Sequence, residues 1–331
     1  MEALMTLIIT IIFFALIFEF INGFHDTANA IAMSVSTRAL SPKIAVVYSG
    51  IINFIGAVSS TAVAKSIGGN IADPMNIKHG SMIVIAALIS AIIWNLLTWY
   101  FGIPSSSSHT LIGSIAGAVI MGSGLHSVNW AGFSTIIEGL LISPVLAFIV
   151  GFIVMKILKL LFRKARPQPT NRGFRLVQIL TAGLTSYSHG GNDGQKTMGI
   201  IVFALVVGGF KTNLDVPLWV QIICALTMAL GTMVGGWRII KTVGGKIFKI
   251  QPIHGFASDF TSFAVMQTAT HFGLPVSTTH VTSSSVLGVG SANHFRSVRW
   301  GTAIRILIAW VITLPISAIL AGVIVSILKL F

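Results

Sequence analysis

Apolar stretches of about twenty residues recur along the whole sequence, and this recurrence restricts what the chain can fold into. A helix needs about 20 mostly apolar residues to cross the hydrocarbon core of a bilayer. Charged residues make up only 9% of the chain, against roughly 25% in soluble domains. The sequence therefore predicts an all-α, multi-pass integral membrane protein, and its apolar stretches are 3–20, 44–63, 82–101, 136–157, 216–236 and 303–328.

Three simple features exclude other classes of protein. The N-terminus carries Glu2 and no basic residue before its first apolar stretch, so that stretch is expected to be a retained helix rather than a cleaved signal peptide. Cys224 is the only cysteine, which excludes an intramolecular disulfide and gives no hint of a thiolate metal site. The net charge of +13 lies in loops rather than on a soluble face, so we expect a lipid bilayer and no nucleic acid as the partner.

The two halves of the sequence repeat the same motifs in the same order. Gly102-Ile-Pro-Ser-Ser-Ser-Ser-His109 matches Gly273-Leu-Pro-Val-Ser-Thr-Thr-His280, and the block beginning at Lys65 matches the block beginning at Lys241. His25-Asp26-Thr27 likewise matches Asn192-Asp193-Gly194. This order indicates an internal duplication. We predict a first transmembrane repeat at 1–162, a basic cytoplasmic linker at 163–173 and a second repeat at 174–331.

The charges of matched loops indicate that the two repeats are inverted. The loop 122–131 has no Lys or Arg, whereas its counterpart 291–301 has Arg296 and Arg299. With the basic linker on the cytoplasmic side, inversion places most of the positive residues inside, as the positive-inside rule requires. Inversion needs an odd number of crossings in each half, and we expect five, with both termini outside. The predicted fold is two inverted-topology helical repeats with broken or re-entrant helices at the midplane.

Two aspartates occupy equivalent places in the repeats, each within a polar, Gly-containing segment beside an apolar stretch. Such a charge costs about 2.5 to 3.5 kcal/mol at the centre of a membrane helix, so Asp26 and Asp193 need a partner. Sodium fits as a hard cation, with backbone carbonyls of a broken helix and the side chains of Asn22, Asn29 and Asn192 as further ligands. The alternative is that each aspartate pairs with Lys196 or a histidine for stability alone.

Each Pro-Ser/Thr motif predicts the first turn of a helix that begins with free hydroxyl and amide donors. Two such helix starts facing each other would surround a tetrahedral oxyanion. Taken singly, a Ser/Thr run in a membrane helix serves helix packing more often than substrate binding. The duplication of the run together with the aspartate motif favours a binding site.

These residues resemble the PiT family of inorganic phosphate transporters. Gly190-Gly-Asn-Asp-Gly-Gln-Lys-Thr-Met-Gly199 is similar to the second signature of that family, and Gly23-Phe-His-Asp-Thr-Ala-Asn-Ala30 is similar to the first. His25 stands where the usual pattern has Asn. The resemblance covers essentially the whole chain.

The resemblance implies a symporter in which sodium ions and inorganic phosphate cross the plasma membrane together by alternating access. It implies sodium ligands at Asp26, Asn29, Asn192 and Asp193, and we expect Asn22 among them from its place in the same polar segment. It implies a phosphate site at Ser105, Ser106, Ser107, Ser108, Gln195, Ser277, Thr278 and Thr279, and we expect Thr110 there as well. We expect no cofactor beyond sodium as the coupling ion, and two equivalent aspartates suggest at least two cations per phosphate.

Other functions remain open at this point. The family also includes carriers that resemble proton-coupled phosphate or sulfate transporters, and an anion channel would share the polar midplane. A membrane hydrolase would use the same Ser, His and Asp residue types. We expect no enzyme, because every element occurs twice and a nucleophile is needed only once. The sequence leaves a homo-oligomer open.

Overall fold

The computed structural model describes residues 2–73, 77, 79–245 and 247–330, and it is built from α-helices. Among these residues the only β pairing is one isolated bridge between Ala72 and Val128. The first half contains α1 (Glu2–Ser36), α2 (Pro42–Val58), α3 (Ala62–Asn70), α4 (Gly80–Tyr100), α5 (Ser107–Ser123) and α6 (Trp130–Leu161). The second contains α7 (Pro167–Val207), α8 (Leu218–Val234), α9 (Trp237–Gly245), α10 (Pro252–His271), α11 (Thr278–His294) and α12 (Trp300–Leu328). The predicted all-α class is confirmed.

The helices have the length and apolar surface that a bilayer requires. α1, α4, α6 and α12 are long and apolar enough to cross a membrane, and two bent helix pairs raise the number of candidate spans to six among the described residues. In these pairs α2 meets α3 at 69° and α8 meets α9 at 71°. Large apolar side chains of α12, such as Val311 and Ile319, are exposed where lipid would lie. These helices therefore supply the broken spans that the sequence predicts.

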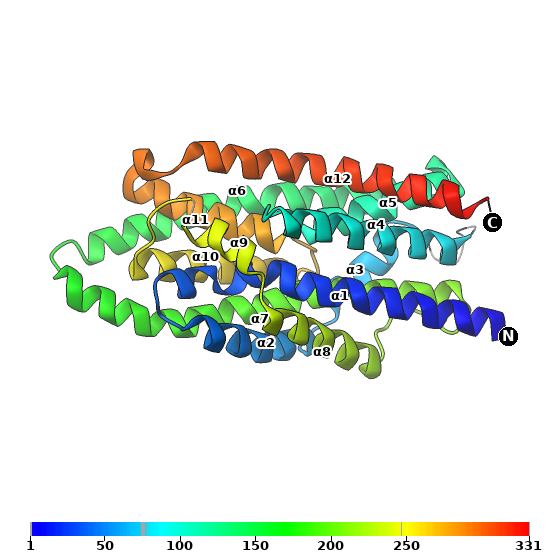
Figure 1. The fold of residues 1–331 in the computed structure, drawn as a ribbon, viewed down its shortest axis with the longest axis horizontal. Helices are drawn as coiled ribbons and strands as arrows, with labels where there is room; N and C mark the ends of the chain where they lie inside the picture. The colour runs from blue at the N-terminus through cyan, green and yellow to red at the C-terminus, as the bar shows by residue number, and fades with distance from the viewer. Residues whose placement is uncertain (1, 74–76, 78, 246, 331) are drawn as a thin grey trace.

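The two halves run in opposite directions, as predicted. Both termini lie at one end of the molecule, and the turn from α6 to α7 lies at the other (Figure 1). Matched contacts recur in both halves: the N–H of Asn129 donates to the carbonyl of Ile71 at 2.9 Å, and that of Arg299 donates to the carbonyl of Ile247 at 2.9 Å. α7 begins at Pro167, inside the segment 163–173 that we predicted as the linker.

α4 with α5, and α10 with α11, form two helical hairpins that enter from opposite ends of the molecule (Figure 1). Their turns contain Gly102 and Gly273, whose φ angles of 65° and 66° are unfavourable for other residues. The tips meet inside the bundle, where the rings of His109 and His280 lie 4.3 Å apart. Each half therefore contains one helical hairpin whose tip lies inside the bundle, and the expected five crossings in each half stay a prediction.

The halves are interlocked, because the last helix of each packs on the hairpin of the other. α6 packs against α11 and α12 against α5. The Lys159 ammonium donates to the carbonyl of Asn293 at 3.0 Å, and the Lys329 ammonium donates to that of Met121 at 2.5 Å. This exchange joins each half to the hairpin of the other.

Helix crossings at the centre depend on glycine. A Cβ added at Gly190 of α7 would lie 2.1 Å from the carbonyl oxygen of Asn53 in α2, whereas one added at Gly173 of the same helix would meet nothing within 4 Å. We expect Gly190→Ala to lower the free energy of unfolding by about 1 to 3 kcal/mol, the range for overpacking. The matched control Gly173→Ala should raise it by about 0.5 to 1 kcal/mol, because alanine favours the helix. Thermal unfolding of the purified variants measures both, and equal stability of the two would contradict the close crossing.

Candidate functional site

The two hairpin tips start helices with the same cap. Ser106 precedes α5 and Ser277 precedes α11, and their hydroxyls accept the backbone N–H groups of His109 at 3.1 Å and His280 at 3.2 Å. A Ser at this position satisfies one of the free amide donors of the first turn. Both helix N-termini, which carry partial positive charge, are therefore directed to the centre of the protein.

Both aspartates lie in the middle of long helices and are buried. α1 and α7 run without interruption through Asp26 and Asp193, so the expectation that the helix breaks there and offers carbonyl ligands was wrong. The glycines of these segments permit close crossings instead: a Cβ at Gly23 would lie 2.4 Å from the carbonyl oxygen of Met228. The breaks lie at α2–α3 and α8–α9. The helices that carry the two aspartates therefore offer no carbonyls of a helix break at this site.

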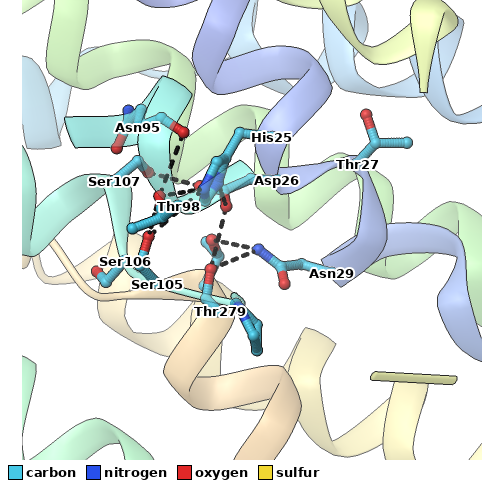
Figure 2. Close-up of polar contacts among 12 residues, drawn as sticks. His25, Asp26, Thr27, Asn29, Asn95, Thr98, Ser105, Ser106, Ser107 and Thr279 are labelled. Carbon is cyan, nitrogen blue, oxygen red and sulfur yellow. Dashed lines mark hydrogen bonds and ion pairs between the residues drawn. The ribbon is translucent and has the colours of Figure 1, made fainter. Parts of the chain in front are cut away.

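Asp26 joins the two hairpins. Its Oδ2 accepts the Ser107 hydroxyl of the first hairpin at 2.5 Å, and its Oδ1 accepts the Thr279 hydroxyl of the second at 3.1 Å. The Nδ1 atom of His25 lies 2.8 Å from Oδ1. Figure 2 shows these side chains converging, while Thr27 points away from them. One carboxylate thus holds donors from both repeats.

Asp193 has a related but different set of partners. Its Oδ2 accepts the Thr278 hydroxyl at 2.8 Å, as Asp26 accepts Ser107. Its Oδ1 accepts the Lys196 ammonium, which also donates to the Ser108 hydroxyl and, at 3.0 Å, to the carbonyl of Val276. Lys196 is fully buried, so this ion pair is shielded from water.

The repeats differ at the position of Lys196. Its equivalent in the first repeat is Asn29, whose amide donates to the Thr279 hydroxyl at 2.9 Å. The second carboxylate therefore has a fixed cation beside it and the first does not. This arrangement is the pairing of Asp193 with Lys196 that the sequence left as an alternative.

The carboxylates of Asp26 and Asp193 lie close together beside the imidazole of His189. Ligand atoms of Asp26, His189 and Asp193 all lie within 4.8 Å of one another, and all three residues are buried. The Nε2 atom of His189 lies 3.5 Å from Oδ2 of Asp193. Lys196 adds an ammonium beside Asp193, so two carboxylates and one ammonium lie at this place.

Two of the predicted site residues also make contacts that hold the framework. Gln195 Oε1 accepts the N–H groups of Val63 at 2.8 Å and Ala64 at 3.3 Å, which caps α3. Asn192 donates to the Thr270 hydroxyl at 3.0 Å and accepts the N–H of Val276 at 3.2 Å, which anchors the second hairpin.

The remaining predicted hydroxyls lie at the first hairpin. Ser105 donates to Thr98 at 2.8 Å, Thr110 donates to the carbonyl of Ser106 at 2.9 Å, and Ser108 donates to the carbonyl of Val276 at 3.0 Å. The structure thus brings together at the two carboxylates Asn29, Ser107, Ser108, Thr278 and Thr279, while Ser105, Ser106, Ser277 and Thr110 shape the helix starts.

Sequence reasoning missed the buried acid Glu19, one of two buried acids besides Asp26 and Asp193 among the described residues. Glu19 of α1 is fully buried, and its Oε2 accepts the Thr197 hydroxyl. Among the residues that the structure describes, Glu19 Oε1 and both polar atoms of the Asn22 amide, one helical turn further on, have no hydrogen-bond partner. The sequence contains a feature that could have identified Glu19, since it is a single charge within an apolar run.

The fold and the site define a membrane transporter with inverted repeats, in which two re-entrant hairpins meet two central carboxylates. Residues 22–321 match the Phosphate transporter family, and the chain belongs to that family. Its relatives are transporters, which agrees with the prediction that it is not an enzyme.

Close relatives cover the whole chain. A probable low-affinity inorganic phosphate transporter of Bacillus subtilis (strain 168) is 54% identical over 331 residues, which cover 100% of this chain and 99% of the relative. A protein of the same description from Rhizobium meliloti (strain 1021) is 42% identical over 96% of this chain and 95% of its own length. A solved structure described as the sodium-dependent phosphate transporter has the same fold, with a TM-score of 0.91 at 24% identity over 98% of this chain and 100% of that one.

Proposed function

We propose that the protein carries inorganic phosphate across the cell membrane together with a cation, by alternating access, with sodium as the first candidate cation. The observation that carries the proposal is the meeting of two hydroxyl-bearing helix N-termini with Asp26 and Asp193. The relatives described as inorganic phosphate transporters support the substrate.

Phosphate binding is supported by the donors that surround the carboxylates. The hydroxyls of Ser107, Thr278 and Thr279 stand at helix N-termini, where anions are favoured. The Lys196 ammonium lies beside Ser108 and adds a positive charge. An oxyanion at this place would receive charge-assisted hydrogen bonds, which are stronger than neutral ones.

The same hydroxyls provide a reason for coupling. Ser107 and Thr279 donate to Asp26, so a cation that binds this carboxylate would take their place and leave both hydroxyls free to donate to phosphate. Each ligand would then favour the other, as linkage requires. The cation also offsets the membrane potential, which opposes an entering anion by roughly 2.3 kcal/mol per charge per 100 mV.

The number of bound cations follows from Lys196. Because its ammonium already pairs with Asp193, Asp26 is the carboxylate left for a monovalent cation, which favours one ion there over two equivalent ions. Sodium ligands would be Asp26, Asn29 and surrounding hydroxyls. Glu19 and Asn22, which have unpaired oxygens among the described residues, form a second place for a cation.

Proton coupling is the second candidate, and one observation favours it. Lys196 and His25 place a titratable nitrogen beside each carboxylate, where a sodium site would have neutral oxygen ligands. A proton bound at Asp26 would release the same hydroxyls.

Reconstitution separates these candidates. Purified protein in liposomes should take up radiolabelled phosphate when a sodium gradient is imposed, and a proton or potassium gradient alone should not drive it. Uptake driven by a proton gradient in sodium-free buffer would establish the second candidate. Absence of phosphate accumulation under every gradient would refute cation-coupled phosphate transport.

The anion site makes a separate prediction. Ser107→Ala and Thr278→Ala should each raise the phosphate concentration needed for half-maximal uptake about ten- to a hundredfold, since a hydrogen bond to a charged partner contributes about 1.5 to 3 kcal/mol. Ser114→Ala is the matched control, because this buried α5 hydroxyl donates to Ser90 at 3.0 Å, away from the carboxylates. If the control and the two variants behave alike, the hydroxyls serve packing only.

A further inference from the structure

A polar pocket opens beside the central site at the break between α2 and α3. Its volume is about 200 Å³, and it is lined by Ser59, Ser60, Tyr187, Gln267, Thr270 and His271. Ser59 and His271 are exposed, so the pocket reaches the surface. At its inner wall Thr270 accepts the amide of Asn192, the residue next to Asp193. The pocket therefore connects the surface with the immediate neighbourhood of the second carboxylate.

The corresponding place in the other repeat is filled. The matched motifs make Phe24 equivalent to Gly191, Trp99 to Thr270, and Tyr100 to His271. The rings of Phe24 and Trp99 pack edge to face with centroids 5.3 Å apart. Large aromatic side chains thus stand where the pocket has a glycine and a hydroxyl.

Arg238 also helps to fill this place in the first repeat. It occupies the position of Ala62 at the start of the short helix after the break. Its guanidinium donates to the carbonyl of Tyr100 and lies 4.9 Å from the Tyr100 ring centroid and 5.3 Å from that of Trp99. Cation–π contacts with two rings and a backbone hydrogen bond hold the side chain across the tip of the first hairpin.

We infer that the polar pocket is the phosphate vestibule of the access state seen here, and that Arg238 with Trp99 and Tyr100 is the closed gate of the opposite vestibule. Inverted repeats place equivalent positions toward opposite faces of the membrane, so an open pocket in one repeat and a filled one in the other are the two sides of a single access state. The hydroxyl, amide and imidazole groups of the pocket suit inorganic phosphate. This inference rests on the proposed alternating access.

Thiol labelling of purified protein tests the gate without measuring transport. Cys224 is fully buried and serves as the unreactive reference. Gln267→Cys, in the open pocket, should react with a hydrophilic maleimide about tenfold faster or more than Cys224. Asn95 lies one helical turn before Trp99 in α4, is buried and has no side-chain partner among the described residues, so Asn95→Cys should react as slowly as the reference.

Opening the gate is the decisive step. Arg238→Ala should raise the labelling rate of Asn95→Cys about tenfold, because it shifts the population toward the open form. Lys241→Ala, an exposed cation one turn away on α9, should leave it unchanged. In liposomes, Gln267→Cys should react from one face and the opened Asn95→Cys from the other. Arg238→Gln replaces Arg238→Ala if the latter does not fold.

Two results would overturn the assignment: labelling of Gln267→Cys as slow as Cys224, or labelling of Asn95→Cys that Arg238 variants do not change. The outcome is independent of the substrate. Asymmetric labelling in a protein that takes up no phosphate would leave the gate standing and refute the proposed function. Phosphate uptake with symmetric labelling would support the proposed function and refute the gate.

Discussion

Replacing Lys196 with methionine is expected to lower the free energy of unfolding by about 3 to 5 kcal/mol, the cost of removing one partner from a buried ion pair. Asp193 would remain buried with the Thr278 hydroxyl as its nearest donor and without its ammonium partner. Methionine has a similar length, so the change removes charge more than volume. Thermal unfolding of the purified protein in detergent measures the loss.

The double variant Asp193→Asn/Lys196→Met is the control for this pair. It removes both charges, so most of the lost stability should return, while phosphate uptake should stay low because the positive charge beside Ser108 is gone. If Lys196→Met alone is as stable as the wild type, the ion pair does not exist in the folded protein.

Asp26→Asn is expected to reduce cation-dependent phosphate uptake by about ten- to a hundredfold while leaving the fold intact. The amide removes the negative charge that a cation would neutralise, and the loss of a charge-assisted interaction corresponds to about 1.5 to 3 kcal/mol. Folding should tolerate the change, since a buried charge without a full counterion is costly in the native state. Uptake against cation concentration measures the effect.

The matched control is Asp215→Asn. This carboxylate is exposed in the loop after α7 and pairs with Lys65 at 2.7 Å, whose hydrogen bond lowers the pKa of Asp215. An exposed pair of this kind contributes little to stability. Its variant should transport phosphate as the wild type does. Unchanged cation activation in Asp26→Asn would show that this carboxylate does not bind the coupling ion.

The sequence predicted much of the architecture because the duplication is visible as matched motifs. Helix starts after Pro104 and Pro275 follow from local chemistry, since the proline and the hydroxyl residue after it suit an N-terminal turn. The inversion followed from loop charges. The burial of Asp26 and Asp193 followed from their apolar surroundings. These features depend on local sequence, which is why they could be read from it.

The wrong expectations concern contacts between distant segments. Glycines near Asp193 suggested a broken helix, but Gly190 lies against Asn53 of α2 and α7 is continuous. Gln195 caps α3, a contact that its motif did not predict, and its place at the anion stays a prediction. Whether a polar side chain faces a ligand or a neighbouring helix end depends on tertiary packing, which motif spacing does not contain.

Locating bound arsenate is the measurement that most directly tests the proposed phosphate site between the two hairpin tips and the two carboxylates. Arsenate has the shape and charge of phosphate, and its anomalous scattering in crystals of the protein identifies the anion. We expect one strong peak between the hairpin tips, within hydrogen-bond distance of Ser107, Thr278 and the Lys196 ammonium. A peak only at the basic segment around Arg166 and Arg172, with none between the tips, would contradict a phosphate site at the two carboxylates.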